Sequence, residues 1–340
     1  MLLHSVFNIA GLTPPFPYTF PLKSVRANGA GATAADWTQV VGNMVPEVPG
    51  QPSWVLENNA LDRANVYQAF SIGSSRESVV DAGNALIDLS HSIDTLDTDA
   101  DGAVAYVEFY DGSSNFLGRS FTPNPLTDVR ITDAKNNIRV PPGTRNVRIG
   151  WLAANIGGTQ LSAYVYDIFA VIKEEVTDTW DSCVVLFAEN AADLTGWTNT
   201  AGTLGIVTYT SSNDWEWQTA NAYFGGSVAT TTAFKNYTFP TGWPAKVSAG
   251  DANYLFRASV HNANQDDDVT ITLRFNNGTT NPTVTSGRIE IGDQIQLIEL
   301  TGAIPSDTTS IDVIFTFHRV DGTVNDGAVE KMSMILFEQV

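Results

Sequence analysis

Three aspartates at alternate positions form the motif whose spacing most directly suggests chemistry. Asp97, Asp99 and Asp101 are followed by a glycine, and Glu108 stands at the twelfth position of the motif. This is the spacing of a calcium-binding loop, in which one tight turn presents several carboxylates to a hard cation. Residues 109–112 read as a strand and a turn, however, which would place Glu108 mid-strand, roughly 20 Å from the loop. We expect either a solvated acidic turn or a calcium site formed by the three aspartates, with Ca²⁺ as the candidate cofactor.

Aromatic side chains provide a second candidate site, suited to a sugar. Trp215 and Trp217 stand two positions apart, so on a strand their side chains share one face. Tyr223 follows them, and Trp54 is the equivalent candidate in the first half of the chain. An aromatic face packs against the CH groups of a pyranose while neighbouring polar side chains bond its hydroxyls. These four residues are candidates for carbohydrate binding, and the alternative is that they fill a core or an interface.

Motifs for catalysis are missing from the sequence. His4, His91, His261 and His318 are scattered and lack the spacing of a metal site. The chain has neither a G-x-S-x-G nucleophile motif nor a glycine-rich phosphate loop before a helix. A glycosidase needs only two carboxylates that meet in space, which sequence spacing does not reveal. We expect no catalytic residues and no enzymatic activity.

The charge of the chain limits its partners. The formal net charge is −19, from 18 Lys and Arg against 37 Asp and Glu. A field of this sign repels DNA and anionic membranes, so we expect no nucleic acid partner. The first residues lack the basic leader and small-residue cleavage site of a signal peptide, and no apolar run reaches transmembrane length. We therefore expect neither a signal peptide nor membrane insertion.

An internal repeat organises the chain. The stretch 140–172 reads as two strands joined by a glycine-containing turn, and 304–336 repeats it 164 positions later, with Trp151 aligned to Phe315. The strand 103–112 recurs in the same way at 269–278. Each copy holds many short segments of strand-like alternation separated by turn residues. The pattern predicts that one β domain is present twice.

The fold class follows from this reading. We predict an all-β protein of two tandem antiparallel β-sandwiches of jelly-roll type, preceded by an extended N-terminal arm. The expected boundaries are 1–34 for the arm, 35–174 for the first sandwich, 175–182 for the linker and 183–340 for the second sandwich. Prolines and aromatics alternate in the arm, where Phe16, Tyr18 and Phe20 either fold back on the first sandwich or dock on another subunit.

The combined motifs carry a resemblance to a known group of modules. The first copy has Trp37 near its start, the strand Phe109–Gly112 in the centre, and the sequence P-x-G-T-R-x-V-R-I before its last strand. The second copy keeps Trp197, Phe275, Gly278, Pro305 and Thr308, and it departs at Asn277, Asp307 and Lys331, where the first has Asp111, Gly143 and Asp167. The chain resembles the galactose-binding-like jelly-roll modules that bind carbohydrate in secreted bacterial enzymes and recur in bacteriophage tail and capsid-surface proteins.

These features predict a non-enzymatic structural protein on a virion surface, of the bacteriophage capsid-decoration or head- or tail-fibre type. It would be made in the host cytoplasm and would dock through its arm on other virion proteins of the capsid or tail. Its sandwiches would contact cell-surface glycans, and it would form a homo-oligomer, with a trimer as the expected state. The first alternative is a secreted-type carbohydrate-binding module protein, and the second is a polysaccharide-degrading enzyme.

Overall fold

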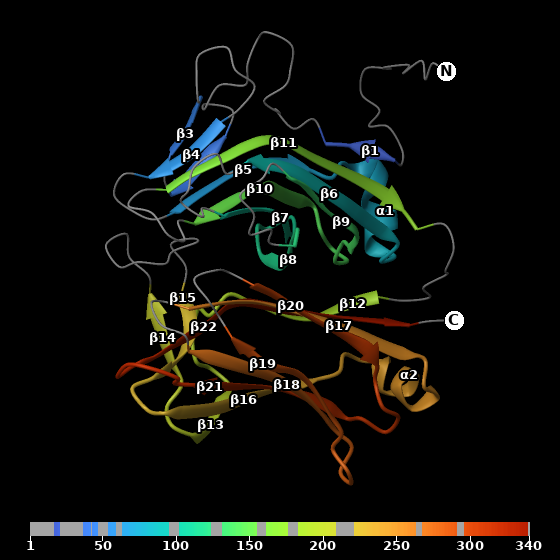
Figure 1. The fold of residues 1–340 in the computed structure, drawn as a ribbon. Helices are drawn as coiled ribbons and strands as arrows, with labels where there is room; N and C mark the ends of the chain where they lie inside the picture. The colour runs from blue at the N-terminus through green and yellow to red at the C-terminus, as the bar shows by residue number, and fades with distance from the viewer. Residues whose placement is uncertain are drawn as a thin grey trace.

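The computed structural model describes residues 17–20, 37–41, 43–46, 54–58, 63–94, 102–123, 131–154, 161–175, 183–208, 221–262, 267–290 and 296–338. Most of them lie in antiparallel strands, which confirms the predicted all-β class. The strands form two sandwiches, one above the other in Figure 1.

The first sandwich consists of two facing sheets. One sheet has the order β3 (Asn43–Pro46), β4 (Trp54–Asn58), β11 (Leu161–Glu174), β6 (Ala85–Asp94) and β9 (Ile131–Arg139), and β1 (Tyr18–Thr19) also pairs with β11. The other has the order β2 (Thr38–Val41), β5 (Arg63–Ser71), β10 (Asn146–Ala154), β7 (Gly102–Tyr110) and β8 (Phe116–Phe121). Successive strands from β4 to β11 give the orders 4-11-6-9 and 5-10-7-8, which is the double Greek key of a jelly roll.

The second sandwich reproduces this topology strand for strand. One sheet has the order β14 (Gly205–Thr208), β15 (Asn221–Gly226), β22 (Asn325–Glu338), β17 (Ala252–Asn262) and β20 (Gln296–Ala303). The other has the order β13 (Trp197–Ala201), β16 (Thr230–Thr238), β21 (Ser310–His318), β18 (Asp268–Asn276) and β19 (Thr283–Glu290). The strand β12 (Cys183–Glu189) pairs with β22. Adding eleven to each strand number of the first sandwich gives the pairings of the second.

Alternation along the central strands explains why each sandwich has a dry core. In β10 the side chains of Val147, Ile149 and Trp151 are buried between the two sheets, as the sequence pattern predicts. Trp37 stacks on Trp151 with ring centroids 4.8 Å apart. In the second copy Trp197 lies at the same distance from Phe315. Each large apolar side chain buried in this way contributes on the order of 1.5–3 kcal/mol.

Two short helices occupy equivalent places in the two copies. Helix α1 (Ser74–Asp81) joins β5 to β6, and α2 (Trp243–Ala249) joins β16 to β17. The sequence does not predict them, because a helix of about two turns is too short to show helical periodicity. Within the described part of the chain, no helix is long and apolar enough to cross a membrane.

The described part of the N-terminal leader belongs to the first sandwich. Tyr18 and Thr19 pair with Ile172 and Val171 of β11, and the Phe20 amide donates to the Ala170 carbonyl at 3.0 Å. The Phe20 side chain is 2% exposed and lies 5.6 Å from the Phe70 ring. The expectation that Phe20 docks on another subunit is therefore wrong, since its ring already fills the core. Phe16 lies outside the described residues, as does the Tyr18 side chain.

The two sandwiches stack through their inner sheets, so the chain forms four β layers (Figure 1). The outer face of the β5–β10–β7–β8 sheet meets the sheet that contains β12, β17, β20 and β22. Leu297 of β20 packs against a cluster from the first sandwich made of Val104, Tyr106, Phe121, Leu152 and Tyr67. This contact is partly apolar, and the polar remainder of the interface forms the site described below.

Gly150 makes close packing possible at the centre of the first sandwich. It pairs with Tyr67 on one side and Tyr106 on the other. A Cβ atom at this position would lie 2.0 Å from the Val66 carbonyl oxygen, whereas one at Gly112 would have its nearest neighbour at 3.7 Å. A substitution at Gly150 must therefore displace backbone of the neighbouring strand.

We expect Gly150→Ala to lower the free energy of unfolding by about 1–3 kcal/mol, because the added methyl group overpacks the strand pair. Urea unfolding followed by tryptophan fluorescence measures this change. Gly112→Ala is the control and is expected to change the free energy by less than about 0.5 kcal/mol. Equal effects of the two substitutions would contradict the packing described here.

Candidate functional site between the two sandwiches

A buried carboxylate of the first sandwich is bonded by cations from both copies. Glu108 on β7 is 0% exposed. Its Oε1 accepts from Arg119 Nε at 2.8 Å and from Lys331 Nζ of the second sandwich at 2.5 Å. Arg119 in turn reaches back across the interface, since its Nη1 lies 3.1 Å from Glu330 Oε2. Two carboxylates and two cations therefore alternate across the contact between the copies.

Opposite charges favour the ionised forms of Glu108 and Arg119 despite their burial. Burial disfavours the ionised form of Glu108, but Lys331 and Arg119 outweigh it and hold the pKa of Glu108 well below its usual range. Burial opposes the charge on Arg119, yet Glu330 and Glu108 outweigh it and raise its pKa. Burial lowers the pKa of Lys331, the neighbouring Arg119 cation lowers it further, and Glu108 and Glu330 act in the opposite direction. We call these four residues the ion network.

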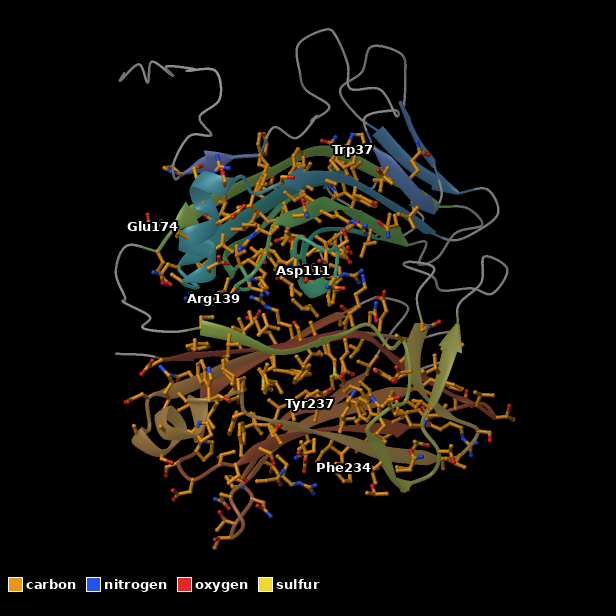
Figure 2. All side chains as sticks on the ribbon, turned by 180° about the vertical axis from the view of Figure 1, so that it is seen from behind. Trp37, Asp111, Arg139, Glu174, Phe234 and Tyr237 are labelled. Atoms are coloured by element: carbon orange, nitrogen blue, oxygen red, sulfur yellow. The ribbon has the colours of Figure 1, made fainter. Side chains whose placement is uncertain are left out.

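A second polar contact lies at the other edge of the interface. Arg139 on β9 donates from Nη1 to the Gly83 carbonyl at 2.5 Å and pairs through Nη2 with Glu175 at 2.6 Å. Its own carbonyl accepts from Arg257 Nη1 at 3.3 Å, and its guanidinium lies 5.9 Å from the Phe337 ring centroid. Figure 2 shows Arg139 and Asp111 on the side of the first sandwich that faces the second.

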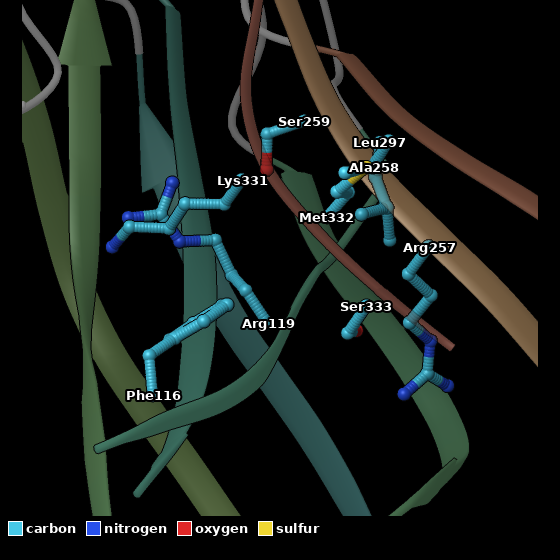
Figure 3. Close-up of a pocket in the computed structure, with 9 residues that line it drawn as sticks. All are labelled: Phe116, Arg119, Arg257, Ala258, Ser259, Leu297, Lys331, Met332 and Ser333. Atoms are coloured by element: carbon cyan, nitrogen blue, oxygen red, sulfur yellow. The ribbon is translucent and has the colours of Figure 1, made fainter. Parts of the chain in front are cut away.

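The gap directly beside the ion network is closed. Figure 3 shows Arg119 and Lys331 with their charged ends next to one another and Phe116 close to them. Lys331 Nζ lies 5.0 Å from the centroid of the Phe116 ring. The space lined by these residues, together with Arg257, Leu297 and Met332, leaves no room for water. This part of the interface binds the copies to each other and has no space for a ligand.

An open cleft begins where the closed contact ends. Its volume is about 530 Å³, within the usual range for small-molecule sites. Both copies line it. The first contributes the end of β7, the turn after it, the start of β8 and one residue of β10. The second contributes the end of β12 and the residues after it, the start of β15 and one residue of β22. The lining residues are Tyr110, Ser114, Asn115, Phe116, Arg148, Ala188, Asn190, Ala192, Asn221 and Lys331. Phe116 and Lys331 belong to both the cleft and the closed contact.

Arg148 and Tyr110, which both line the cleft, form a stack with Tyr67. The Arg148 guanidinium carbon lies 4.7 Å from the Tyr67 ring centroid and 4.4 Å from that of Tyr110. Arg148 Nη1 donates to the Tyr110 hydroxyl at 3.0 Å, and that hydroxyl donates to Glu108 Oε2 at 2.6 Å. Burial and the nearby Glu108 raise the pKa of Tyr110, so this phenol keeps its proton. The chain of hydrogen bonds ties the cleft wall to the ion network.

The rim of the cleft is set by a tight turn after β7. The Asp111 carboxylate accepts from the amides of Ser113 and Asn115 and from Asn115 Nδ2, each at 2.8 Å. These hydrogen bonds, that from the Asn115 side chain first, lower the pKa of Asp111. Ser114 takes a positive φ of 66° at the tip of the turn. The side chain of Asn115 is thereby held at the mouth of the cleft.

The second sandwich carries the central charge pair with its signs reversed. Arg148 and Glu108 are partners across β10 and β7, and the equivalent partners across β21 and β18 are Asp312 and Arg274. Arg274 Nε donates to Asp312 Oδ2 at 2.8 Å. The guanidinium of Arg274 lies 5.3 Å from the Phe234 ring, which pairs with β21 where Tyr67 pairs with β10. In the first copy this charged face meets the other sandwich, and in the second it lies on the outermost sheet.

The structure separates the candidate residues of the sequence analysis. Tyr223 is 2% exposed, packs beside Trp197 at 5.0 Å, and donates to Glu189 Oε2 at 3.1 Å. It is a core residue, and the prediction that it forms a sugar platform is wrong. Glu108 lies mid-strand, as the spacing argument predicts. The calcium candidates (Asp97, Asp99, Asp101) and the tryptophans Trp215 and Trp217 lie outside the described residues, as does the Trp54 side chain.

The cleft residues were missed because they come from both copies. Arg148 and Lys331 meet only after the sandwiches stack, and no local pattern predicts that contact. The sequence contains one indication of this site, because the second copy has Lys331 at the position where the first copy has Asp167. Within the described segments, no group of His, Cys, Asp and Glu side chains could hold a metal ion. The cleft offers aromatic faces, amides and a guanidinium, which are groups that bind a polar ligand.

Comparison with known proteins gives matches in structure alone. No family model matches the chain, and no curated protein matches it. The CBM22-1–CBM22-2 tandem domain of Paenibacillus barcinonensis Xyn10C is 13% identical and aligns over 95% of this chain and 98% of its own, with a TM-score of 0.31. PNGase F, a glycosylasparaginase from Flavobacterium meningosepticum, is 10% identical over 85% of this chain and 96% of its own, with a TM-score of 0.36. The bacteriophage CBA120 tailspike protein 4 is 9% identical over 44% of this chain and 20% of its own, with a TM-score of 0.30. The jelly-roll fold itself is established by the strand order.

We expect Glu108→Gln to lower the free energy of unfolding by about 3–5 kcal/mol, because it leaves Arg119 and Lys331 with buried, unbalanced charge. Asp88→Asn is the control at a partly exposed ion pair. Asp88 Oδ2 pairs with Lys173 Nζ at 2.7 Å, and the two side chains are 31% and 32% exposed, so neither charge is left buried when the pair is broken. Its loss is expected to be about 1 kcal/mol or less. Chemical denaturation at neutral pH measures both changes.

The difference in stability between wild type and Glu108→Gln is expected to depend on pH. The pKa of Glu108 is lower in the folded chain than the 4.5 of a free glutamate side chain, so its stabilising effect is present above that pH. The effect is lost as the pH falls through the lower, folded value. The stability difference between wild type and Glu108→Gln should therefore shrink as the pH falls below 4.5. A difference that stays constant into strong acid would contradict the ion network.

Proposed function

We propose that this chain is a non-enzymatic carbohydrate-binding protein that holds a saccharide in the cleft between its two sandwiches. The observation that carries the proposal is the composition of the cleft wall. The rings of Tyr110 and Phe116 lie beside the amides of Asn115, Asn190 and Asn221. A saccharide needs these two kinds of group together, because its CH faces pack on rings while its hydroxyls both donate and accept hydrogen bonds.

The position of the cleft supports this proposal. Small-molecule sites form preferentially at domain interfaces, where two rigid surfaces meet at an angle. Here the walls are held by hydrogen bonds that are independent of any ligand, as in the Asp111 turn and the chain from Arg148 through Tyr110 to Glu108. A site that is already ordered loses little conformational entropy when the ligand binds.

A hydrolytic reaction fits this cleft poorly. Polysaccharide cleavage commonly requires two carboxyl groups that face the substrate. The two carboxylates of the ion network, Glu108 and Glu330, are buried and ion-paired to Arg119. Neither is among the residues that line the cleft. Binding without turnover is therefore the role that we propose.

The virion-surface role stays a prediction from the sequence, with other virion proteins as partners and a homo-oligomer as the assembly. One of its premises is weakened, because Phe20 of the leader is committed to the first sandwich. Glycan contact is common to this role and to the proposed function, so a saccharide site in the cleft is compatible with both.

We expect the full chain to bind a subset of glycans on a glycan array, and Phe116→Leu to weaken that binding by about tenfold or more, because it removes a ring face while keeping apolar volume at the interface. Titration calorimetry with the best glycan measures the change. Phe169→Leu is the matched control, since Phe169 lies on β11, is 52% exposed and does not line the cleft.

Two results would count against the proposed function. One is the absence of any saccharide binding by a chain that is folded by circular dichroism. The other is binding that is weakened equally by Phe116→Leu and Phe169→Leu, because a saccharide would then occupy a site other than the cleft.

A further inference from the structure

The charged groups in the cleft are opposite in sign to the protein as a whole. The chain carries a net charge of −19. Among the described residues that line the cleft, the charged side chains are Arg148 and Lys331, and none carries a carboxylate. A cationic recess in an acidic protein focuses attraction for an anion at one place.

Arg148 is positioned before any ligand arrives. Its guanidinium is stacked between Tyr67 and Tyr110, and Nη1 is directed to the Tyr110 hydroxyl. The side chain is nevertheless 37% exposed, so it faces the cleft without being sealed in the interface. An arginine held by stacking presents its planar fork in a fixed orientation, and this lowers the entropic cost of binding an anion.

The neighbouring carboxylates do not cancel this cation. Glu108 lies 3.9 Å from Arg148 Nη1, but it is already bonded to Arg119, Lys331 and Tyr110. Glu330 is paired with Arg119 as well. The five charged groups of the ion network and cleft wall are therefore two carboxylates and three cations, which leaves one positive charge in excess.

In the part of the chain that the structure describes, two further acidic residues, Asp111 and Glu189, are sequence neighbours of residues that line the cleft, and both carboxylates have other partners. The carboxylate of Asp111 is bonded within its own turn, to the backbone and side chain of Asn115. Glu189 pairs with Lys235 at 2.6 Å and accepts from the hydroxyls of Tyr223 and Tyr237. Hydrogen bonds to amides do not neutralise Asp111, so the cationic character of the cleft comes from Arg148 and Lys331 in its lining and not from the net count of charges around it.

We propose that the saccharide bound in this cleft carries a carboxylate, as a hexuronate does, and that Arg148 is the residue that recognises it. This inference rests on the proposed function and specifies the ligand class of the same site. A planar guanidinium matches the two oxygens of a carboxylate in a bidentate contact, which is why arginine recognises this group better than a lysine does. The amides around it would bond the remaining hydroxyls of the sugar.

The experiment uses matched ligands and the full chain. Neutral trisaccharides of glucose, galactose and mannose are compared with the same trisaccharides whose primary alcohols are oxidised to carboxylates, and with their sulfated forms. The oxidised form of the best-fitting sugar is expected to bind about tenfold or more tighter than its neutral parent, the gain of one charge-assisted hydrogen-bonded contact. The preference is expected to decrease at high salt, because the contact is partly exposed.

Substitutions of Arg148 test whether this residue causes the preference for the oxidised sugar. Arg148→Met should bring the oxidised sugar down to the affinity of its neutral parent, and Arg148→Lys should keep only part of the preference. Arg145→Met is the control, since it removes the same charge from a residue that pairs with Asp81 and lies outside the cleft lining. Thermal unfolding of each variant shows whether it is folded. If Arg148→Met does not fold, the loss of preference is measured with Arg148→Lys instead.

Each outcome separates this inference from the proposed function. Equal binding of neutral and oxidised sugars overturns the carboxylate inference while saccharide binding stands. Tighter binding of sulfated sugars than of carboxylated ones also overturns it, as does a preference that survives in Arg148→Met. Failure of all the saccharides to bind overturns both proposals, and acetate or citrate binding as tightly as the oxidised sugar would show that the cleft recognises the anion alone.

Discussion

The shared carboxylate of Glu108 is the contact on which the rest of this structure depends. Ions removed from water cost several kcal/mol each unless they are paired and hydrogen-bonded. Glu108 takes one of its cations from its own sandwich and one from the other, so its burial is tolerable only when the two copies are stacked. The same contact brings Phe116 and Lys331 to the edge of the cleft. Stability of the pair and formation of the site thus have one physical origin.

Duplication explains the scaffold, and divergence explains the site. The two copies have the same strand order and the same tryptophan packing on the equivalent core ring. They differ on the outer face of one sheet, where the pair Arg148–Glu108 in the first copy corresponds to Asp312–Arg274 in the second. On the face that meets the other copy, Glu108 pairs with Lys331 of β22, whereas on the outermost face Arg274 and Asp312 form an ion pair within one sheet. One jelly-roll scaffold has thereby produced an interface in one copy and an exposed surface in the other.

Most of the fold can be predicted from the sequence, but little of the site can. Alternation of apolar residues in 147–151 and in the repeat at 311–315 predicted the strands and the cores, because the period of two follows from local backbone geometry. The burial of Tyr223 was not predicted, since its surroundings depend on β15 lying beside the long strand β22. Helix α1 was missed because its eight residues carry little helical periodicity. Arg148 and Lys331 meet through stacking of the copies, and this tertiary contact leaves no pattern in either segment alone.

The most direct test of this account is the distance between the two sandwiches in solution. Exposed Ser78 on α1 and Ser248 on α2 are replaced by cysteine for nitroxide labels, with the native Cys183 replaced by serine. Double electron–electron resonance then gives the distribution of distances between the labels. If the buried ion network fixes the copies to one another, the distribution has a single narrow peak at neutral pH. A broad or multiple distribution would show that the sandwiches move independently, and it would contradict both the shared interface and the cleft that it forms.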